Sequence, residues 1–471
     1  MTVPEVTNFV SYTGFASPMD FNGMVRHYFL RKAGNVADIR VNLADKDHRA
    51  QQSHALVLRL RKDLEQIAAA NGAAMKIVET PPGPPVLSSL VAEIYGSMDQ
   101  SYSQLTAGAE HIKKIMGQEP FVVDIDDSVE TLRPRINFVL DKEKAAMHGI
   151  SAQTVNQTLR MAVSGDTPAT AHLPGERQPL MVKAILPVDK RSGFSFLAQI
   201  PVKTAAGAMI PLAELVKPEM IPAEQTIYHK NMKRVVFVTA DMAGRAPAEA
   251  ILDMQSKLKK DPVPDGLMVQ WAGEGEWKIT IRVFRDMGIA FAAAMLGIYI
   301  LLIIDTGSFF MPLLIMMAIP LTLLGIMPGF WLLNLFTAEG VGGFANPIFF
   351  TATSMIGMIA LGGIVIRNSL VLIEFIQEAV ARGLGFREAI LQSGAIRMRP
   401  ILLTAATTAI GAFPITLDPV FSGLAWALIF GLLASTVFTL LVVPVTYFAL
   451  YQRQFEKVAA TPTPAGEEDL E

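Results

Sequence analysis

The sequence predicts an α+β protein in two unlike parts: sheet-and-helix subdomains outside the membrane, followed by an α-helical membrane domain of five transmembrane helices. Of its 471 residues, 51% are hydrophobic and only 18% are charged, which is more apolar than an ordinary soluble domain. The apolar surplus lies after Asp286, in runs long enough, at ~20 residues per crossing, to span a bilayer. We expect the crossings at about residues 287–304, 309–336, 348–375, 398–417 and 421–451.

Basic residues predict the orientation of these helices. They lie after the third crossing and after the fifth, whereas the loops around Glu339 and Asp418 carry no Lys or Arg. The basic residues are Arg382, Arg387, Arg397, Arg399, Arg453 and Lys457. By the positive-inside tendency, the tail at residues 452–471 is cytoplasmic and residues 1 to about 286 are periplasmic, in a Gram-negative inner membrane.

The two chain ends carry further expectations. The opening residues MTVPEVTNFVSYTGFASPMDF have neither the basic n-region nor the apolar h-region of a signal peptide. A helix far downstream is a poor candidate to translocate the large domain before it, so we expect an upstream membrane helix, on a longer chain or on a separate one. The segment TPTPAGEEDLE is expected to be disordered.

Strand-like and helical patterns alternate in the part expected to be periplasmic. VLSSLVAEIY, residues 86–95, reads as a strand, and the next helix places Leu105, Ala109, Ile112 and Ile115 on one face. A second helix is predicted to begin at Ser53 and to stop at Gly72. Its apolar residues lie in one stripe, which consists of Val57, Leu60, Leu64 and Ile67. Such β-α-β units predict small ferredoxin-like domains.

Several classes of function lack sequence support. There is no cysteine, the seven histidines show no HxH or HxxxH spacing, and no glycine run forms a GxxxxGK[ST] phosphate loop. A net charge of −3 does not indicate the excess of basic residues that is typical of nucleic-acid-binding proteins. The paired glutamates of AGEGEW, residues 272–277, immediately precede the first crossing and are interpreted as shaping that junction. We therefore expect no enzyme, no cofactor, no resident metal and no nucleic-acid partner.

Five ordered segments carry a family resemblance. They are PPGPPVLSSLVAEIYG, LDKEKAAMHGISAQTVNQTLRMAVSG, GLMVQWAGEGEW, LGGIVIRNSLVLIEF and RMRPILLTAATTAIGAFP. Together they resemble the C-terminal half of a resistance-nodulation-division (RND) efflux permease of the AcrB-like type, from near Phe9 to Tyr451. The family has twelve helices, and this chain would hold the last five.

The resemblance implies an organisation and a set of partners. Residues 1–85 would be part of the first C-terminal porter subdomain, 86–134 and 225–275 the second, 135–224 a docking subdomain, and 284–451 the transmembrane domain. The family implies export driven by the proton gradient, a homotrimer, a periplasmic adaptor and an outer-membrane channel. It also implies an N-terminal half, on the same or a separate chain, that carries two relay aspartates.

Arg367 lies inside an otherwise apolar run. One interpretation is that the helix ends there and the side chain snorkels to the interface. Against it, Pro347 to Phe375 would span about 43 Å, more than a ~30 Å hydrocarbon core requires. In the resembled family this position is a lysine paired with the two aspartates. An arginine cannot release a proton at workable pH, so Arg367 would be a fixed charge that lowers the pKa of partner carboxylates. Glu374, seven residues on, is interpreted as the cytoplasmic end of the helix.

Two other positions match the family's proton pathway. Arg397 and Thr404 correspond to its eleventh-helix arginine and threonine, and their seven-residue spacing lets one helical face present both. The alternatives are positive-inside charge for Arg397 and Arg399, and hydroxyls bonded to the preceding turn for Thr404, Thr407 and Thr408. We assign the relay to Arg367, Arg397 and Thr404.

The segment NFVSYTGFASPMDFNG, residues 8–23, is the candidate substrate surface. It interleaves Phe9, Tyr12, Phe15 and Phe21 with glycines, which predicts a mobile loop that could bind an amphiphile; the alternative is a strand and turn with core aromatics. Met19, Met24 and Met75 keep open a heavy-metal exporter of the same superfamily. A truncated inactive product and a membrane-anchored binding protein also remain open.

Overall fold

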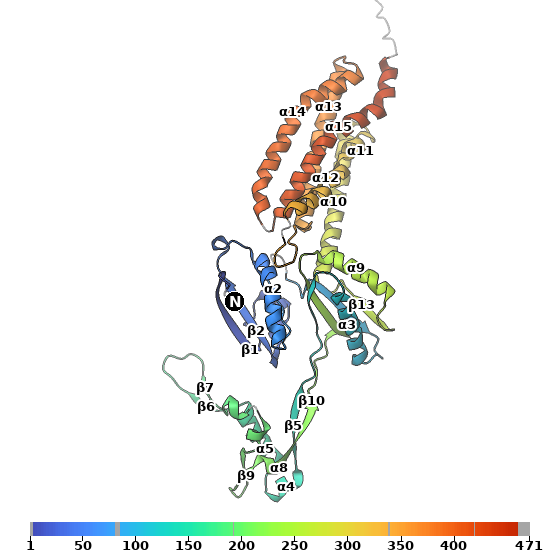
Figure 1. Ribbon diagram of the computed structural model, residues 1–471. Coiled ribbons are helices and arrows are strands. Elements are labelled where there is room, and N and C mark those ends of the chain that lie inside the picture. The colour runs from blue at the N-terminus through green and yellow to red at the C-terminus, as the bar shows by residue number, and fades with distance from the viewer. Residues whose placement is uncertain (1–2, 81–84, 192, 338–339, 419, 460–471) are drawn as a thin grey trace, which may run out of the picture. The chain divides into compact units, whose positions relative to one another are not determined.

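The computed structural model describes residues 3–80, 85–191, 193–337, 340–418 and 420–459 (Figure 1). It divides into two compact units, which are treated separately: Met1–Ser128 with Tyr228–Glu471, and Val129–Ile227. The segment expected to be disordered, residues 461–471, and most of the PPGPP run lie outside the described residues.

An antiparallel sheet is the centre of the extramembrane part of the first unit (Figure 1). Its strands run in the order β11-β12-β3-β13, and β4 also pairs with β12. The strands are β3 (Leu90–Gly96), β4 (Val122–Asp127), β11 (His229–Lys230), β12 (Lys233–Met242) and β13 (Leu267–Gln270). The segment expected as a strand at residues 86–95 is thus confirmed as β3 from Leu90 onward.

Helix α3 (Tyr102–Gly117) packs on this sheet, and α9 (Pro247–Lys260) packs beside α3. A reciprocal Ser101–Gln104 capping box satisfies donors at the start of α3. The four residues predicted to share its inner face are all buried: Leu105, Ala109, Ile112 and Ile115. The helical period in this sequence therefore identified the packing face correctly.

A two-stranded antiparallel sheet precedes the central sheet in the chain. It is built from β1 (Val6–Phe15) and β2 (Lys32–Leu43), with short helices α1 (Phe21–Val25), η1 (Tyr28–Leu30) and η2 (Lys46–His48) and the longer α2 (Ser53–Ala70). The loop expected at residues 8–23 is wrong for its first half, because residues up to Phe15 pair with β2. Helix α2 begins at Ser53, as predicted, but the predicted apolar stripe is not its buried side. Leu64 and Ile67 are exposed, whereas Leu56, Leu58 and Arg61 are buried.

The second unit, Val129–Ile227, has its own small core. Val155, Val202, Leu212, Leu215 and Val216 pack together within it. Its strands are β5 (Pro134–Leu140), β6 (Asp166–Ala171), β7 (Leu180–Ala184), β8 (Pro201–Lys203), β9 (Met209–Pro211) and β10 (Val216–Pro222). Its helices are α4 (Lys142–Met147), α5 (Ala152–Val163), α6 (Val188–Arg191), α7 (Phe194–Leu197) and α8 (Leu212–Leu215). Strands β5 and β10 pair, as do β6 with β7 and β8 with β9.

Five helical segments of the described chain are long and apolar enough to cross a membrane, as the sequence predicted. They comprise α10 (Glu276–Thr306), α11 (Met311–Met316) with α12 (Ala318–Thr337), α13 (Ala352–Ala381), α14 (Phe386–Ala412) with η3 (Phe413–Leu417), and α15 (Ser422–Ala459). Helix α10 begins 11 residues, and α14 12 residues, before the predicted apolar runs at 287 and 398. The first turns of both helices contain charged residues, so a search for apolar runs does not include them although they are helical.

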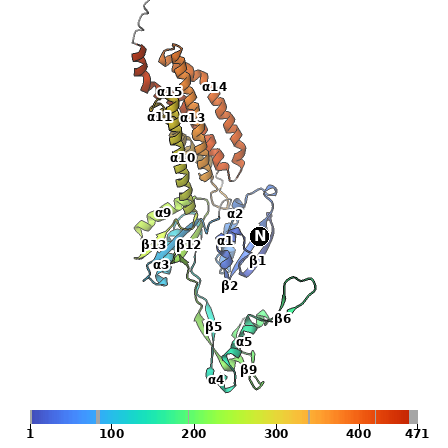
Figure 2. The same cartoon turned by 180° about the vertical axis from the view of Figure 1, so that it is seen from behind.

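Small residues bring the membrane helices close together. Figure 1 and Figure 2 both show α13 and α15 side by side, and α12 also packs against α15. A Cβ atom at Gly325 of α12 would lie 2.1 Å from that of Ala434 on α15, and one at Gly431 would lie 2.2 Å from a methyl of Leu361 on α13. Close backbone approach of this kind replaces the hydrophobic effect as the source of helix association in lipid.

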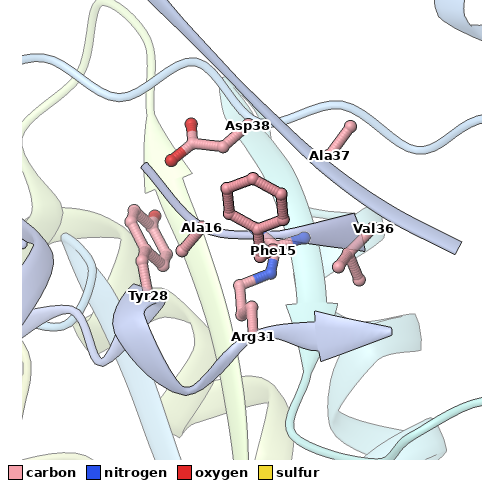
Figure 3. A pocket seen from close by; sticks show the side chains of 7 residues that line it. All are labelled: Phe15, Ala16, Tyr28, Arg31, Val36, Ala37 and Asp38. Carbon is pink, nitrogen blue, oxygen red and sulfur yellow. The ribbon is translucent and has the colours of Figure 1, made fainter. Parts of the chain in front are cut away.

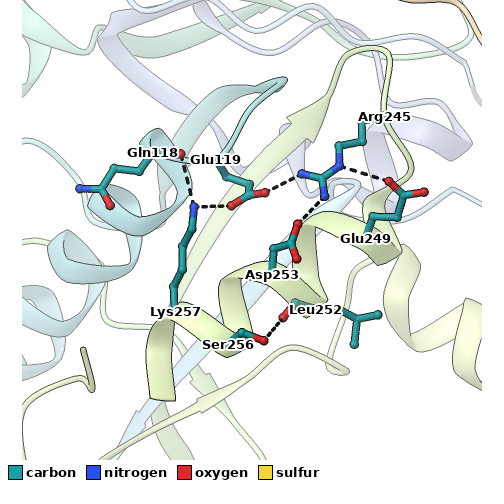
Figure 4. Close-up of polar contacts among 8 residues, drawn as sticks. All are labelled: Gln118, Glu119, Arg245, Glu249, Leu252, Asp253, Ser256 and Lys257. Atoms are coloured by element: carbon teal, nitrogen blue, oxygen red, sulfur yellow. Dashed lines mark hydrogen bonds and ion pairs between the residues drawn. The ribbon is translucent and has the colours of Figure 1, made fainter. Parts of the chain in front are cut away.

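An ion cluster ties α3 to α9 in the first unit. Figure 4 shows Glu119, just after α3, between Arg245 and Lys257, with an oxygen 2.5 Å from each cation. Arg245 also donates to Asp253 and Glu249, at 2.5 and 3.2 Å. Hydrogen bonds to Asp253 and then to Glu119 raise the pKa of Arg245 despite its partial desolvation. The Arg245 guanidinium therefore stays charged at any workable pH.

Replacing Glu119 should loosen this corner of the fold. Glu119 is 2% exposed at its side chain, so Glu119→Ala leaves two cations without their shared buried acceptor and should lower local stability by about 1–3 kcal/mol. Hydrogen exchange of the α3 and α9 amides measures this effect. Glu249→Ala is the matched control: its side chain is 65% exposed, and we expect a change below about 1 kcal/mol. Equal exchange in the two variants would contradict a structural role for the cluster.

Candidate functional site

One face of α13 points away from the other described membrane helices. Ile356, Ala360, Gly363, Arg367 and Glu374 follow one another at spacings of three, four or seven residues, and all are exposed. The opposite face, which includes Leu361, Val365 and Leu372, is buried against the bundle. This outward face of α13, defined by those five residues, is therefore free in the described part of the chain.

Arg367 sits near the middle of this face and forms no ion pair with any described residue. Glu374 is exposed two turns further on and is likewise unpaired within the described residues. The helix continues to Ala381, so it does not end at Arg367, as the snorkelling interpretation would require. A guanidinium in the middle of a long apolar helix needs an anionic partner if it is buried in the membrane.

Arg397 on α14 reaches back to α13. Its guanidinium carbon lies 4.3 Å from the ring centroid of Phe375, a cation–π arrangement. Its Nε atom is buried and has no hydrogen-bond partner among the described residues. Arg399 is exposed, which is compatible with the positive-inside interpretation of that residue.

The threonines of α14 bond to their own helix. The hydroxyls of Thr404 and Thr408 donate to the carbonyls of Ile401 and Thr404, at 3.0 and 2.8 Å, and Thr407 donates to Leu403 and Thr404. This is the local bonding that we gave as the alternative to a relay role. A hydroxyl oxygen retains acceptor capacity in this state, so the relay assignment of Thr404 stays a prediction.

The three relay candidates are not in mutual contact, but two lie at a similar depth. Helices α13 and α14 are joined by only four residues, 382–385, and so run antiparallel. At 1.5 Å per residue, Arg367 lies about 12 Å along α13 from Phe375, and Thr404 about 10 Å along α14 from Arg397. Since Phe375 and Arg397 are in contact, Arg367 and Thr404 lie at nearly the same level.

A buried ionic group near the start of α10 escaped the sequence analysis. Glu93, in the middle of β3, is 0% exposed and accepts hydrogen bonds from Lys230 at 2.6 Å and from the Tyr95 hydroxyl at 2.7 Å. Lys230 also contacts Glu274 at 2.5 Å. A Cβ at Gly273 would lie 1.7 Å from a Glu93 oxygen, so that position requires glycine.

These contacts shift the pKa of two groups. Burial, and then the bond to Glu93, raises the pKa of Tyr95. Burial alone would lower the pKa of Lys230, but hydrogen bonds to Glu274 and Glu93 more than offset it, and the pKa is raised. AGEGEW, which contains Gly273 and Glu274, was the available signal, and its interpretation as a junction fits this geometry. A lone glutamate in an otherwise apolar strand was a second signal at Glu93, but the local sequence gives no partner for it, because Lys230 lies 137 residues away.

The aromatic candidates are on the surface. Phe9 is 67% and Phe21 66% exposed, so the core alternative does not describe them. A register shift at Gly14, whose φ is +85°, brings Phe15 into edge contact with Tyr12, at 5.9 Å between centroids. Figure 3 shows Phe15 in a depression with Tyr28, Arg31 and Asp38. That depression leaves no room for a water-sized molecule, so any ligand there must bind an open surface or a changed conformation.

The methionine candidates do not form an assembled site in this structure. Met19 and Met24 are exposed, and Met75 is half-buried. Within the described ranges, no three His, Asp or Glu side chains group as a metal ion would require. Support for the alternative of heavy-metal export must therefore come from the methionines themselves and from comparison with known proteins.

Five apolar helices joined to sheet-rich domains define a polytopic membrane protein with a large extramembrane part. A sequence model of the AcrB/AcrD/AcrF family matches residues 3–451. The chain therefore belongs to this family, the RND permeases, as the motifs predicted.

Individual relatives differ in what their names say they act on. The swarming motility protein SwrC of Bacillus subtilis (strain 168) is 26% identical over 369 residues, 77% of this chain and 33% of that protein. The nickel and cobalt resistance protein CnrA of Cupriavidus metallidurans is 26% identical over 76% of this chain and 32% of its own length. The multidrug resistance protein MdtC of Escherichia coli O139:H28 is 25% identical over 86% of this chain and 38% of its own length.

The fold is shared with solved efflux pumps. A crystal structure of a heavy metal efflux pump matches 96% of this chain with a TM-score of 0.72 at 21% identity, and 44% of the pump chain is covered. At this identity the likeness concerns the fold alone. This chain spans about a third of the curated relatives SwrC and CnrA and less than half of the solved pump.

The exposure of Arg367 predicts that its removal spares the stability of this chain. Arg367→Ala should not lower the free energy of unfolding by more than about 0.5 kcal/mol, because no described residue pairs with the guanidinium. Leu361→Ala, which opens a cavity against Gly431, should cost about 2–5 kcal/mol. Thermal unfolding of the purified chain in detergent, followed by circular dichroism, compares them, with outward-facing Ile356→Ala as the apolar control. A loss for Arg367→Ala as large as that for Leu361→Ala would show that the arginine is a structural residue of this bundle.

Proposed function

We propose that this chain is the C-terminal half of an RND exporter driven by the proton-motive force, which moves amphiphilic compounds out of the periplasm or inner membrane. The observation that carries the proposal is Arg367, an unpaired cation on the free outward face of α13 within the described chain. An N-terminal half that supplies carboxylates to this face would satisfy the charge. No covalent chemistry and no cofactor is needed, because the proton gradient supplies the energy.

Arg367 acts in this scheme as a fixed charge. While the partner carboxylates are ionised, they pair with the guanidinium and draw the two helix faces together. When they bind protons the pairing is lost, and the helices can adopt a second arrangement. Arginine cannot itself lose the proton, so the cycle depends on the carboxylates alone. Thr404, at the depth of Arg367, and Arg397, about two turns away along α14, would line the proton path.

The remaining organisation follows the family. Residues 1 to about 286 would be periplasmic, as ferredoxin-like porter subdomains with a docking insertion, and the C-terminus would be cytoplasmic. The working unit would be a trimer that joins a periplasmic adaptor and an outer-membrane channel. The Glu93–Lys230–Glu274 group would hold the start of α10 to the central sheet, so movement of this helix would reach the porter domain.

The exposed aromatics favour an amphiphilic substrate. Phe9, Phe15 and Phe21 are exposed and Tyr12 is half-buried, and Arg31 lies beside Phe15. This combination of aromatic faces and a cation suits drug-sized molecules with a polar end. A heavy-metal cation is the second candidate, favoured by the names of CnrA and of the solved pump. Met19 and Met24, both exposed near the aromatic surface, would then be the soft ligands.

Co-expression with an N-terminal half that carries an aspartate pair tests the proposal. The pair should restore proton-dependent dye export in an efflux-deficient host, and Arg367→Ala should abolish it because the carboxylates lose their counter-charge. Arg367→Lys keeps the charge and should retain part of the activity, and Arg399→Ala should leave it intact. Export that survives Arg367→Ala would contradict the assignment of Arg367 to the proton relay.

The substrate class is tested separately. If amphiphiles bind the aromatic surface, Phe9→Ala with Phe21→Ala should reduce dye export several-fold and leave resistance to metal ions unchanged. If metal ions are carried, Met19→Leu with Met24→Leu should abolish metal resistance and spare the dyes. Minimum inhibitory concentrations of dyes and of Co²⁺, Ni²⁺ and Cu⁺ distinguish the two. Loss of dye export in the methionine variant alone would contradict the aromatic assignment.

A further inference from the structure

A hollow of about 560 Å³ lies between α14 and α15. Arg387, Leu391, Gly394 and Met398 line it on α14, and Leu441 and Phe448 are among its residues on α15. Arg387 is the one charged residue of the lining, and the others are apolar. We call this hollow the α14–α15 groove. Its volume is within the range of about 300–1,000 Å³ that is typical of small-molecule sites.

The sequence explains why the groove is open. A Cβ at Gly394 would meet nothing within 4 Å, so the glycine leaves space that no neighbour fills. Pro444 on α15 has no N–H, so it cannot bond the carbonyl of Leu440 and the helix is weakened at this point. Phe448 stacks on Phe386 at 5.7 Å and closes the end near Arg387. The groove is therefore open along its length and bounded at one end by two aromatic rings.

The length of the groove matches one leaflet of a bilayer. Arg387 and Met398 are 11 residues apart on α14, which corresponds to about 16 Å along the helix. Half of a ~30 Å hydrocarbon core is about 15 Å. On α15 the lining from Leu440 to Phe448 lies at the cytoplasmic end of the crossing predicted at 421–451, so an acyl chain of that leaflet can enter the groove there. On α14 the lining before Met398 precedes the predicted crossing and extends toward the headgroups.

The positive charge of Arg387 at one end of the groove favours a ligand with an anionic headgroup. Arg387 is exposed and pairs with no described carboxylate, whereas its neighbour Arg382 pairs with Glu378 at 2.5 Å. It stands in the first turn of α14, whose N-cap Gly385 provides no side-chain hydrogen bond, so the positive end of the helix dipole adds to its charge. Glu388 in the same turn opposes this field but forms no ion pair with Arg387 in the described structure.

We propose that the α14–α15 groove binds one anionic phospholipid, with an acyl chain in the groove and the phosphate on Arg387. A basic pocket between membrane helices at the cytoplasmic side suits such a headgroup, and the predicted orientation places Arg387 at that side. This inference does not depend on what the protein exports.

The test uses the purified full chain in nanodiscs of equal parts dioleoylphosphatidylglycerol and dioleoylphosphatidylcholine. After mild detergent extraction, native mass spectrometry counts the lipids that stay bound. The wild-type chain should retain about fivefold more phosphatidylglycerol, the ratio that corresponds to about 1 kcal/mol for one basic residue. Arg387→Gln should remove this preference, and Arg399→Gln, an exposed arginine of the same helix outside the lining, should keep it.

A second variant tests the acyl-chain part. Gly394→Leu fills the groove and should lower retention of both lipids; leucine is the better helix former, so α14 is preserved. Gly411→Leu is the matched control, because Gly411 also has open space around it but lies outside the groove. Equal retention of both lipids by the wild type, or unchanged retention in Gly394→Leu, would overturn the proposal in favour of unspecific annular lipid. Displacement of the lipid by the N-terminal half would identify the groove as a protein interface and also overturn it.

Discussion

A charge held in hydrocarbon must have a partner, and this constraint organises what we infer about the protein. Arg367 lies near the middle of α13, on a face that the other described helices leave free. Leaving a guanidinium unpaired in the bilayer costs several kcal/mol, which is comparable with the whole stability of a domain. The bundle packs without engaging it, through glycines and apolar side chains. The carboxylates of the proposed N-terminal half would supply the partner that this charge requires.

Buried charges outside the membrane show the contrasting solution. Glu119 and Glu93 are both removed from water, and each is neutralised by cations from segments distant in the sequence. Lys230, between Glu93 and Glu274, ties the central sheet to the turn before α10, so the first membrane helix starts from a rigid base. Arg367 and Arg387 differ from these groups because their charges face outward, one toward a proposed carboxylate pair and the other toward a proposed phosphate.

Features that depend on local composition could be predicted from the sequence. Five crossings followed from long apolar runs, and the inner face of α3 from its helical period, and both are confirmed. Features that depend on distant residues were missed. The buried side of α2 includes Arg61, whose partner Asp124 lies in β4, and β1 forms because β2 pairs with it. The porter and docking boundaries and the relay residues stay predictions, because no contact in the described structure tests them.

The most direct test of the central claim is proximity between Arg367 and the proposed carboxylates. The chain has no cysteine, so a single cysteine introduced at position 367 is its one reactive thiol. A second cysteine replaces one aspartate of the co-expressed N-terminal half, and a short thiol-specific cross-linker is applied to membranes. We predict efficient joining of the halves for Arg367→Cys and none for Ile300→Cys, an exposed position on α10. Equal or absent cross-linking at the two positions would contradict the claim that Arg367 faces the partner's carboxylates.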